Sequence, residues 1–173
     1  MINEPEFWKR DLARIAAQLA RRKTQRAWRK ATYATFEKQV MLGFYVARKL
    51  IEARWVDPDI TTAPVAVTTF SCKNTRVYRG AWQDVEEQYD LSKPSPRKLQ
   101  LKSLCDQIIH SFVFTPAFRQ QRLTAVYLCS WERRDQVFRV EVDELVRILE
   151  ATARSQRVIL IRFGIEVNRL DEP

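Results

Sequence analysis

The sequence contains little glycine: only Gly43, Gly80 and Gly164 occur among its 173 residues. Loops that cradle nucleotide phosphates need clustered glycines, because the backbone N–H groups must approach the phosphates closely. No two of these glycines lie close enough in the chain to form such a loop. The sequence therefore excludes P-loop nucleotide hydrolases and dinucleotide enzymes with a GxGxxG fingerprint.

Cysteine and histidine are also scarce. Cys72, Cys105 and Cys129 are odd in number, widely spaced and without a CxxC pair, which argues against a disulfide framework and a zinc ribbon. The single histidine, His110, could complete a Cys3His zinc site with them. However, Cys105 and His110 would lie about 140° apart around a helix and point to different faces. We therefore expect no metal, no cofactor, and cysteines that act as small buried apolar side chains.

Long apolar runs are missing as well. The longest uninterrupted run covers residues 40–47, whereas a bilayer span needs about 20 apolar residues. The first thirty residues carry charges throughout and lack the apolar segment of a secretory signal. We expect a cytoplasmic protein that does not associate with membranes.

The composition is that of a globular chain, with 46% hydrophobic and 29% charged residues. Its length corresponds to one domain of ordinary size. We predict a single domain over residues 1–173, made of a basic helical hairpin (1–56) and a sheet-containing part (62–173).

Positive charge is concentrated at the N-terminal end of the chain. The formal net charge is +9, and residues 1–54 contain 13 Lys+Arg against 5 Asp+Glu. No acidic residue occurs between residues 12 and 36, and the whole chain has 21 Arg against 9 Lys. The planar arginine fork suits bidentate phosphate contacts. This asymmetry indicates an anionic partner, although a solvated helix face in an arginine-rich chain would produce the same pattern.

The apolar spacing predicts two N-terminal helices. The first follows Pro5, and a tight connection with Thr24 as N-cap lies near residues 23–25. The second covers residues 25–54 and ends before Asp57-Pro58. Gly43 on this helix marks either a kink or a close helix crossing.

Further elements are predicted from periodicity and turn signals. They are a β-hairpin (65–72 and 75–79), a short helix (82–89), a loop (91–97), a helix (99–114), two strands (123–130 and 137–142), a helix capped by Asp143 and a final strand (157–167). We therefore predict an α+β fold, with a long N-terminal helical hairpin packed on an antiparallel or mixed sheet of about five strands and two or three further helices. Strand order does not follow from these patterns.

The basic hairpin carries the leading functional hypothesis, which is that a small binding protein contacts the DNA or RNA backbone mostly without reading sequence. Trp28, between two arginines, could stack on bases if exposed. The alternative is a protein-interaction module, in which the same surface docks on an acidic protein or forms a homodimer. The candidate phosphate-binding residues are Arg14, Arg21, Arg22, Lys23, Arg26, Arg29 and Lys30.

A third hypothesis is a hydrolase or nuclease. Ser103, Asp106 and His110 would share the polar face of the 99–114 helix, where the carboxylate could orient the imidazole as a general base. Polar residues belong on such a face without any catalytic role. An acidic metal site at residues 141–144 lacks a nearby lysine, since none follows Lys102. We therefore expect a binding protein rather than an enzyme.

Overall fold

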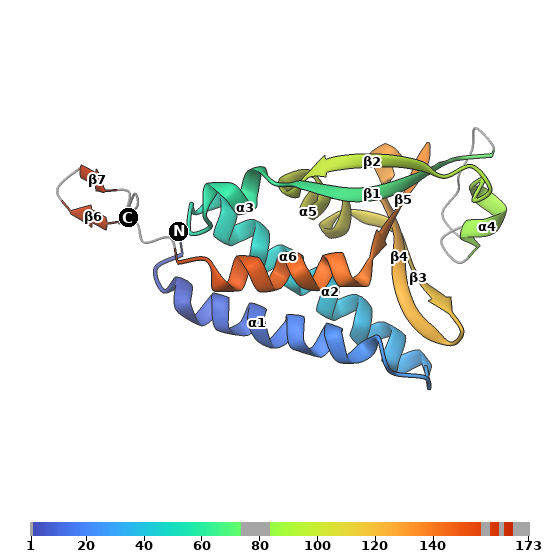
Figure 1. Ribbon diagram of the computed structural model, residues 1–173, viewed down its shortest axis with the longest axis horizontal. Helices are drawn as coiled ribbons and strands as arrows, with labels where there is room; N and C mark the ends of the chain where they lie inside the picture. Colours follow the sequence, from blue (N-terminus) through green and yellow to red (C-terminus); the bar gives the residue numbers. More distant parts are fainter. Residues whose placement is uncertain (1, 74–83, 157–159, 163–164, 168–173) are drawn as a thin grey trace.

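The computed structural model describes residues 2–73, 84–156, 160–162 and 165–167 (Figure 1). Its helices are α1 (Pro5–Arg22), α2 (Lys30–Glu52), α3 (Pro58–Thr62), α4 (Val85–Gln88), α5 (Leu101–Ile109) and α6 (Val142–Arg154), with a 3-10 turn, η2, at Trp131–Arg133. Its strands are β1 (Pro64–Ser71), β2 (Ser95–Gln100), β3 (Ser111–Arg119), β4 (Arg122–Ser130), β5 (Gln136–Glu141), β6 (Leu160–Arg162) and β7 (Ile165–Val167). The predicted α+β class is confirmed.

Five of the strands form one antiparallel sheet in the order β2-β1-β5-β4-β3. Strand β5 is thus inserted between β1 and β4, and β2 and β3 are the two edges. The register places Thr68, Arg139 and Tyr127 in one row across three strands. Strands β6 and β7 pair with each other in a separate antiparallel ladder.

Helices α1, α2, α5 and α6 lie on one face of the sheet. Helices α5 and α6 contact the strands, and α1 and α2 pack against these two helices (Figure 1). Strand residues on this face, such as Thr69, Leu128 and Phe138, are buried. On the opposite face Ala66 and Glu141 are exposed. One hydrophobic core therefore joins residues from the N-terminal helices with residues from the sheet.

Gly43 marks a close helix crossing. A Cβ atom at this position would lie 2.9 Å from Leu149 Cδ1 on α6 and 3.2 Å from Ile15 Cγ2 on α1. The glycine allows α1, α2 and α6 to approach one another more closely than side chains at this position would permit.

The predicted start of the second helix was wrong. Helix α2 begins at Lys30, and its N-cap Arg29 is extended (φ −105°, ψ 163°). Two side-chain hydrogen bonds hold the preceding turn instead: Gln25 donates to the Ala27 carbonyl (2.7 Å), and Trp28 Nε1 donates to the Gln25 carbonyl (3.0 Å). These local bonds compete with helix formation.

Two strands that contain a proline were missed. The helix predicted over 99–114 ends at Ile109, and residues from Ser111 onward form β3, which includes Pro116. The predicted loop over 91–97 leads instead into β2, which includes Pro96. Both are edge strands, the position where a sheet tolerates proline.

Four smaller predictions are compared with the structure next. Glu141 is the N-cap of α6, while Asp143 lies in the first turn and forms an ion pair with Lys23. The single strand predicted over 157–167 contains two short strands, β6 and β7, which pair with each other. Strand β1 pairs with β2 and β5, while the expected partner strand, 75–79, lies outside the described residues. Of the helix predicted over 82–89, the described part is helical only at Val85–Gln88.

Candidate nucleic-acid interface

The turn between α1 and α2 packs against the β3–β4 hairpin through five aromatic side chains, here called the aromatic cluster: Trp28, Tyr33, Phe36, Phe114 and Phe118. Trp28 lies at its centre, with ring centroids 5.2 Å from Tyr33, 5.7 Å from Phe36 and 5.0 Å from Phe118. Phe36 is fully buried, and its ring lies 5.9 Å from that of Phe114. The cluster thereby fixes one end of the helical hairpin to one end of the sheet (Figure 1).

The β3–β4 hairpin ends in a turn of two residues. Gln120 and Gln121 both have positive φ angles, 50° and 62°, between the paired residues Arg119 and Arg122. Two successive left-handed residues are the signature of a type I′ turn, whose twist matches that of the strands. The turn therefore holds Arg119 and Arg122 beside Phe118 at the end of the hairpin.

Five exposed cations lie around the aromatic cluster, and we call them the basic tip: Arg26, Arg29, Lys30, Arg119 and Arg122. Three come from the turn that joins α1 to α2 and from the start of α2, and two come from the β3–β4 turn. Neither residues 12–36 nor residues 111–130 contain a carboxylate side chain. Within the described residues, no cation of the basic tip forms an ion pair with a carboxylate. The basic tip is thus an exposed positive surface built from two distant parts of the chain.

The structure divides the predicted phosphate-binding residues into two groups. Arg26, Arg29 and Lys30 belong to the basic tip, and Arg21 is exposed at the end of α1. The other three have partners: Arg14 pairs with Asp11, Arg22 donates to Gln25 Oε1 (2.7 Å), and Lys23 pairs with Asp143.

The site differs from the sequence prediction mainly in the burial of Trp28 and in the residues that the β3–β4 turn contributes. Trp28 is partly buried and packs inside the aromatic cluster, whereas Tyr33 and Phe118 are 39% and 37% exposed. The contributions of Phe118, Arg119 and Arg122 were missed. No clear sequence signal indicated them, because Gln120-Gln121 lacks the glycine, asparagine or aspartate that usually marks a two-residue hairpin turn.

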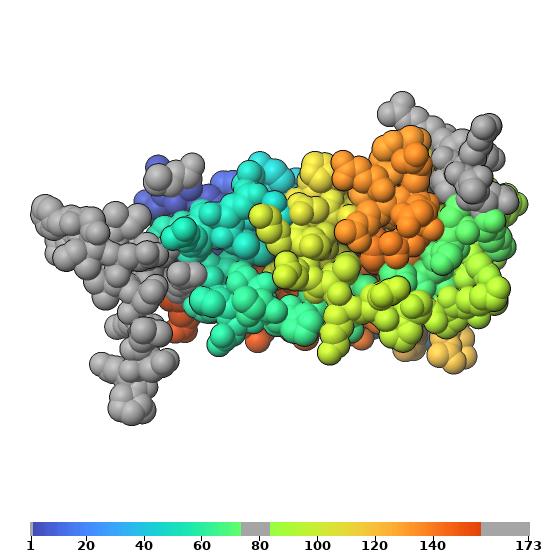
Figure 2. All heavy atoms as spheres, turned by 90° about the horizontal axis from the view of Figure 1, so that it is seen from above, coloured from blue at the N-terminus to red at the C-terminus, as the bar shows by residue number. Residues whose placement is uncertain are grey.

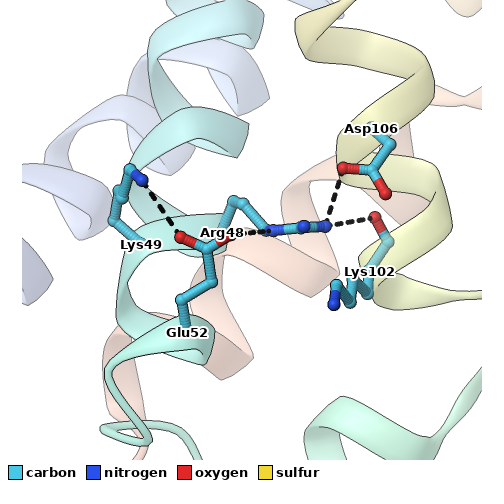
Figure 3. Close-up of polar contacts among 5 residues, drawn as sticks. All are labelled: Arg48, Lys49, Glu52, Lys102 and Asp106. Carbon is cyan, nitrogen blue, oxygen red and sulfur yellow. Dashed lines mark hydrogen bonds and ion pairs between the residues drawn. The ribbon is translucent and has the colours of Figure 1, made fainter.

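The candidate catalytic residues lie along α5 and at its C-cap, but Asp106 has a different partner from the one expected. Its carboxylate accepts a hydrogen bond from Arg48 Nη1 on α2 (2.7 Å), and the same nitrogen donates to the Lys102 carbonyl (3.1 Å), as Figure 3 shows. His110 is the C-cap of α5 and is exposed, and Ser103 is partly exposed. In the described part of the chain, no side-chain hydrogen bond links these three residues.

Arg48 is the centre of this polar group. It also donates to Glu52 Oε1 (2.7 Å), and Lys49 pairs with Glu52 Oε2 (3.0 Å) (Figure 3). Burial lowers the pKa of Arg48, but its hydrogen bonds with Glu52 and Asp106 outweigh burial and leave this pKa raised. The hydrogen bonds from Arg48 and Lys49 lower the pKa of Glu52. Through Arg48, this polar group connects α2 to α5 by hydrogen bonds.

The open face of the sheet carries a groove of about 660 Å³ near β2. Figure 2, which views the molecule from above, shows atoms of β1, β2 and β5 together on this side. Arg97 and Lys98 line the groove, and Arg139 pairs with Glu141 on its floor. Because that carboxylate neutralises one of the cations, the groove carries less net positive charge than the basic tip.

The described residues offer neither a metal site nor a membrane span. They contain no group of three His, Cys, Asp or Glu side chains that could hold a metal ion. None of the helices in these ranges is long and apolar enough to cross a membrane.

No protein-family model, curated protein or solved structure matches the chain. The function is therefore argued from the residues of this chain alone.

Proposed function

We propose that this protein binds the sugar-phosphate backbone of nucleic acids through the basic tip. The observation that carries the proposal is the convergence, from two distant segments, of five exposed cations that form no ion pair with any carboxylate of the described residues. Four of the five are arginines, whose guanidinium groups bind phosphate oxygens in bidentate geometry. Backbone contacts of this kind supply most of the affinity of non-specific binding and carry no sequence information.

Arg21 extends the binding surface along α1. It is exposed, and it lies in the last turn of α1, directly before the connection that carries Arg26 and Arg29. Lys23 and Arg22 hold the turn next to this surface, because Lys23 pairs with Asp143 and Arg22 donates to Gln25. Each phosphate neutralised at the surface releases condensed counterions, so binding is expected to weaken steeply as salt concentration rises.

The test compares two variants with equal changes in net charge. Arg26→Glu/Arg119→Glu reverses one charge from each segment of the basic tip, while Arg97→Glu/Lys98→Glu reverses two exposed charges on β2, at the far edge of the sheet. Fluorescence anisotropy with labelled DNA and RNA over a salt series gives the affinity and its salt dependence. We expect wild type and the β2 variant to bind with similar affinity, and the tip variant to lose more than tenfold in affinity. Its slope of log affinity against log salt should fall by about two.

Two results would contradict this proposal. Equal losses in both variants would mean that overall charge, and not the basic tip, determines binding. An absence of binding by wild type at low salt would exclude backbone binding altogether.

The alternative proposal, a protein-interaction or homodimer contact, has support from another surface. Leu42 and Tyr45 on α2 are 47% and 44% exposed and lie on one side of the helix. Neighbouring exposed apolar side chains of this size are typical of contacts between proteins. Sedimentation equilibrium at increasing concentration tests this alternative: a dimer that Leu42→Glu dissociates would support it, and a monomer throughout would exclude homodimerisation.

A hydrolase is not proposed. Its orienting carboxylate, Asp106, binds Arg48 instead of His110. An activity abolished by His110→Ala would reopen that hypothesis.

A further inference from the structure

We infer that the ligand of the basic tip is single-stranded nucleic acid, and that one unpaired base stacks on the exposed rings of Tyr33 and Phe118. This inference rests on the proposed function, because the cations of the basic tip would hold the phosphates on either side of that base. It adds a ligand class and two residues that backbone binding alone does not require.

The two rings form a fixed aromatic corner. Their centroids are 6.0 Å apart and their planes are nearly perpendicular, at 78°. Trp28 contacts both rings from within the cluster and is itself held by its hydrogen bond to the Gln25 carbonyl. A base stacked on one ring would meet the edge of the other, so the corner accommodates one base rather than a continuous stack. Because the rings are already positioned, binding would cost little side-chain entropy.

Cations neighbour the two rings of this aromatic corner along both segments of the chain. Arg119 directly follows Phe118, and Arg122 is paired with Arg119 across the turn. Lys30 begins the helix on which Tyr33 lies in the first turn. The next carboxylate along α2 is Glu37, one turn beyond Tyr33, and it marks the limit of the positive surface. Exposed aromatic rings among phosphate-binding cations are the arrangement by which single strands are bound without sequence preference.

A duplex cannot use these rings in the same way. Its bases are stacked on one another, and their faces become accessible only after unpairing, which costs free energy. A duplex would therefore gain only from the cations, whereas a single strand would gain from the cations and from stacking.

A second copy of the chain fits the corner poorly. In a twofold dimer the same surface faces itself, so the five cations of one basic tip would lie against the five of the other. Like charges placed opposite one another oppose association. The cations favour a polyanionic ligand, and the exposed rings favour a ligand with flat, apolar faces. Single-stranded nucleic acid has both properties.

The experiment uses three 20-nucleotide probes: oligothymidylate, an abasic strand of the same length, and a duplex. The abasic strand keeps the phosphates and lacks bases, so it tests stacking on the ligand side without any protein variant. We expect wild type to bind oligothymidylate at least fivefold more tightly than the abasic strand, a difference in the range of one stacked base. Binding to the duplex should be weaker than binding to oligothymidylate at the same salt concentration.

The variant Tyr33→Leu/Phe118→Leu removes the aromatic faces while keeping apolar side chains in the cluster. It should bind oligothymidylate and the abasic strand with equal affinity, and circular dichroism should confirm that it folds. If this variant does not fold, the comparison of probes on wild type still decides the question.

The failures of the two proposals are distinguishable. Equal wild-type affinity for oligothymidylate and the abasic strand overturns the stacking inference, but backbone binding stands if the tip variant still loses affinity for both probes. No binding of any probe overturns both proposals. Full retention of the preference for oligothymidylate in a folded Tyr33→Leu/Phe118→Leu variant would show that bases are bound elsewhere on the protein.

Discussion

Lys9 on α1 donates a hydrogen bond from Nζ to the main-chain carbonyl of Ser155, at 2.7 Å, although the lysine is only 5% exposed. Ser155 is the C-cap of α6, so a positive charge lies at the negative end of that helix dipole. The Ser155 hydroxyl also donates to Asp57 Oδ2 (2.8 Å) and accepts from the Asp57 N–H (2.9 Å). One residue after α6 thus joins α1, α6 and the segment between α2 and α3.

Removal of the Lys9 ammonium group should destabilise the protein. In Lys9→Met the carbonyl of Ser155 loses a charged donor in a buried position, and such a loss costs about 1.5–3 kcal/mol. Urea denaturation of Lys9→Met and of Lys38→Met, which changes an exposed lysine on α2, measures the difference. Equal free energies of unfolding for the two variants would contradict this prediction.

Stability should fall at alkaline pH. Burial raises the pKa of Cys105 from its ordinary 9.0 to about 12, and burial also raises the pKa values of Cys129 and Tyr89. Between pH 9 and 12 the unfolded chain releases protons that the folded chain keeps, so the free energy of unfolding decreases as pH rises. For each such group the slope approaches about 1.4 kcal/mol per pH unit.

The alkaline effect can be assigned by a variant. Urea denaturation at pH 7, 9 and 10.5 should show a shallower decline for Cys105→Ala than for wild type, since the variant lacks one of the protected protons. A decline of unchanged steepness would assign the effect to other groups.

The helix crossing at Gly43 should not tolerate a branched side chain. In Gly43→Val the new atoms would overlap Leu149 and Ile15, whose nearest atoms already lie 2.9 Å and 3.2 Å from a Cβ at this position. Overpacking of this kind costs about 1–3 kcal/mol. Leu42→Val is the matched control, because it places the same β-branched residue at the adjacent, exposed position. A loss no larger than that of the control would mean that the helices move apart at little cost.

The hairpin turn offers a stabilising substitution. Gln121 has a φ of 62°, in the left-handed region that glycine adopts without strain. Gln121→Gly should therefore raise the free energy of unfolding by about 0.5–1 kcal/mol. Thermal denaturation compares it with Gln136→Gly, in which a glycine within strand β5 should destabilise. A lower melting temperature for Gln121→Gly would contradict the prediction.

Local sequence patterns predicted the helices better than the strands at the sheet edges. Helices α1 and α6 follow apolar spacing closely, because each buries one face against the core. Phe112 lies at a helical spacing from Ile108 and extended the predicted helix into what is strand β3. The tolerance of an edge strand for Pro116 depends on strand order, which only tertiary pairing determines.

Only the part of the candidate site on the α1–α2 turn was predicted, because only that part is formed by residues that are close together in the sequence. Arg26, Arg29 and Lys30 form a visible cluster along the chain, so the turn between the two helices was predicted as basic. The approach of Phe118 and Arg119 to Trp28 depends on long-range packing between β3 and α2, and no local pattern encodes it. Burial of Trp28 and exposure of Tyr33 both result from that packing.

The prolines of the two edge strands have a consequence for how the molecule behaves in concentrated solution. An open sheet exposes unpaired backbone groups along both edges, and these groups can recruit strands from other molecules and start aggregation. Pro96 lies within β2 and Pro116 within β3, so each edge carries a residue that cannot donate to an incoming strand. Arg97 and Lys98 add two adjacent positive charges on β2. Neither edge therefore offers an uninterrupted row of backbone donors, and this disfavours edge-to-edge addition of strands from other molecules on both sides of the five-stranded sheet.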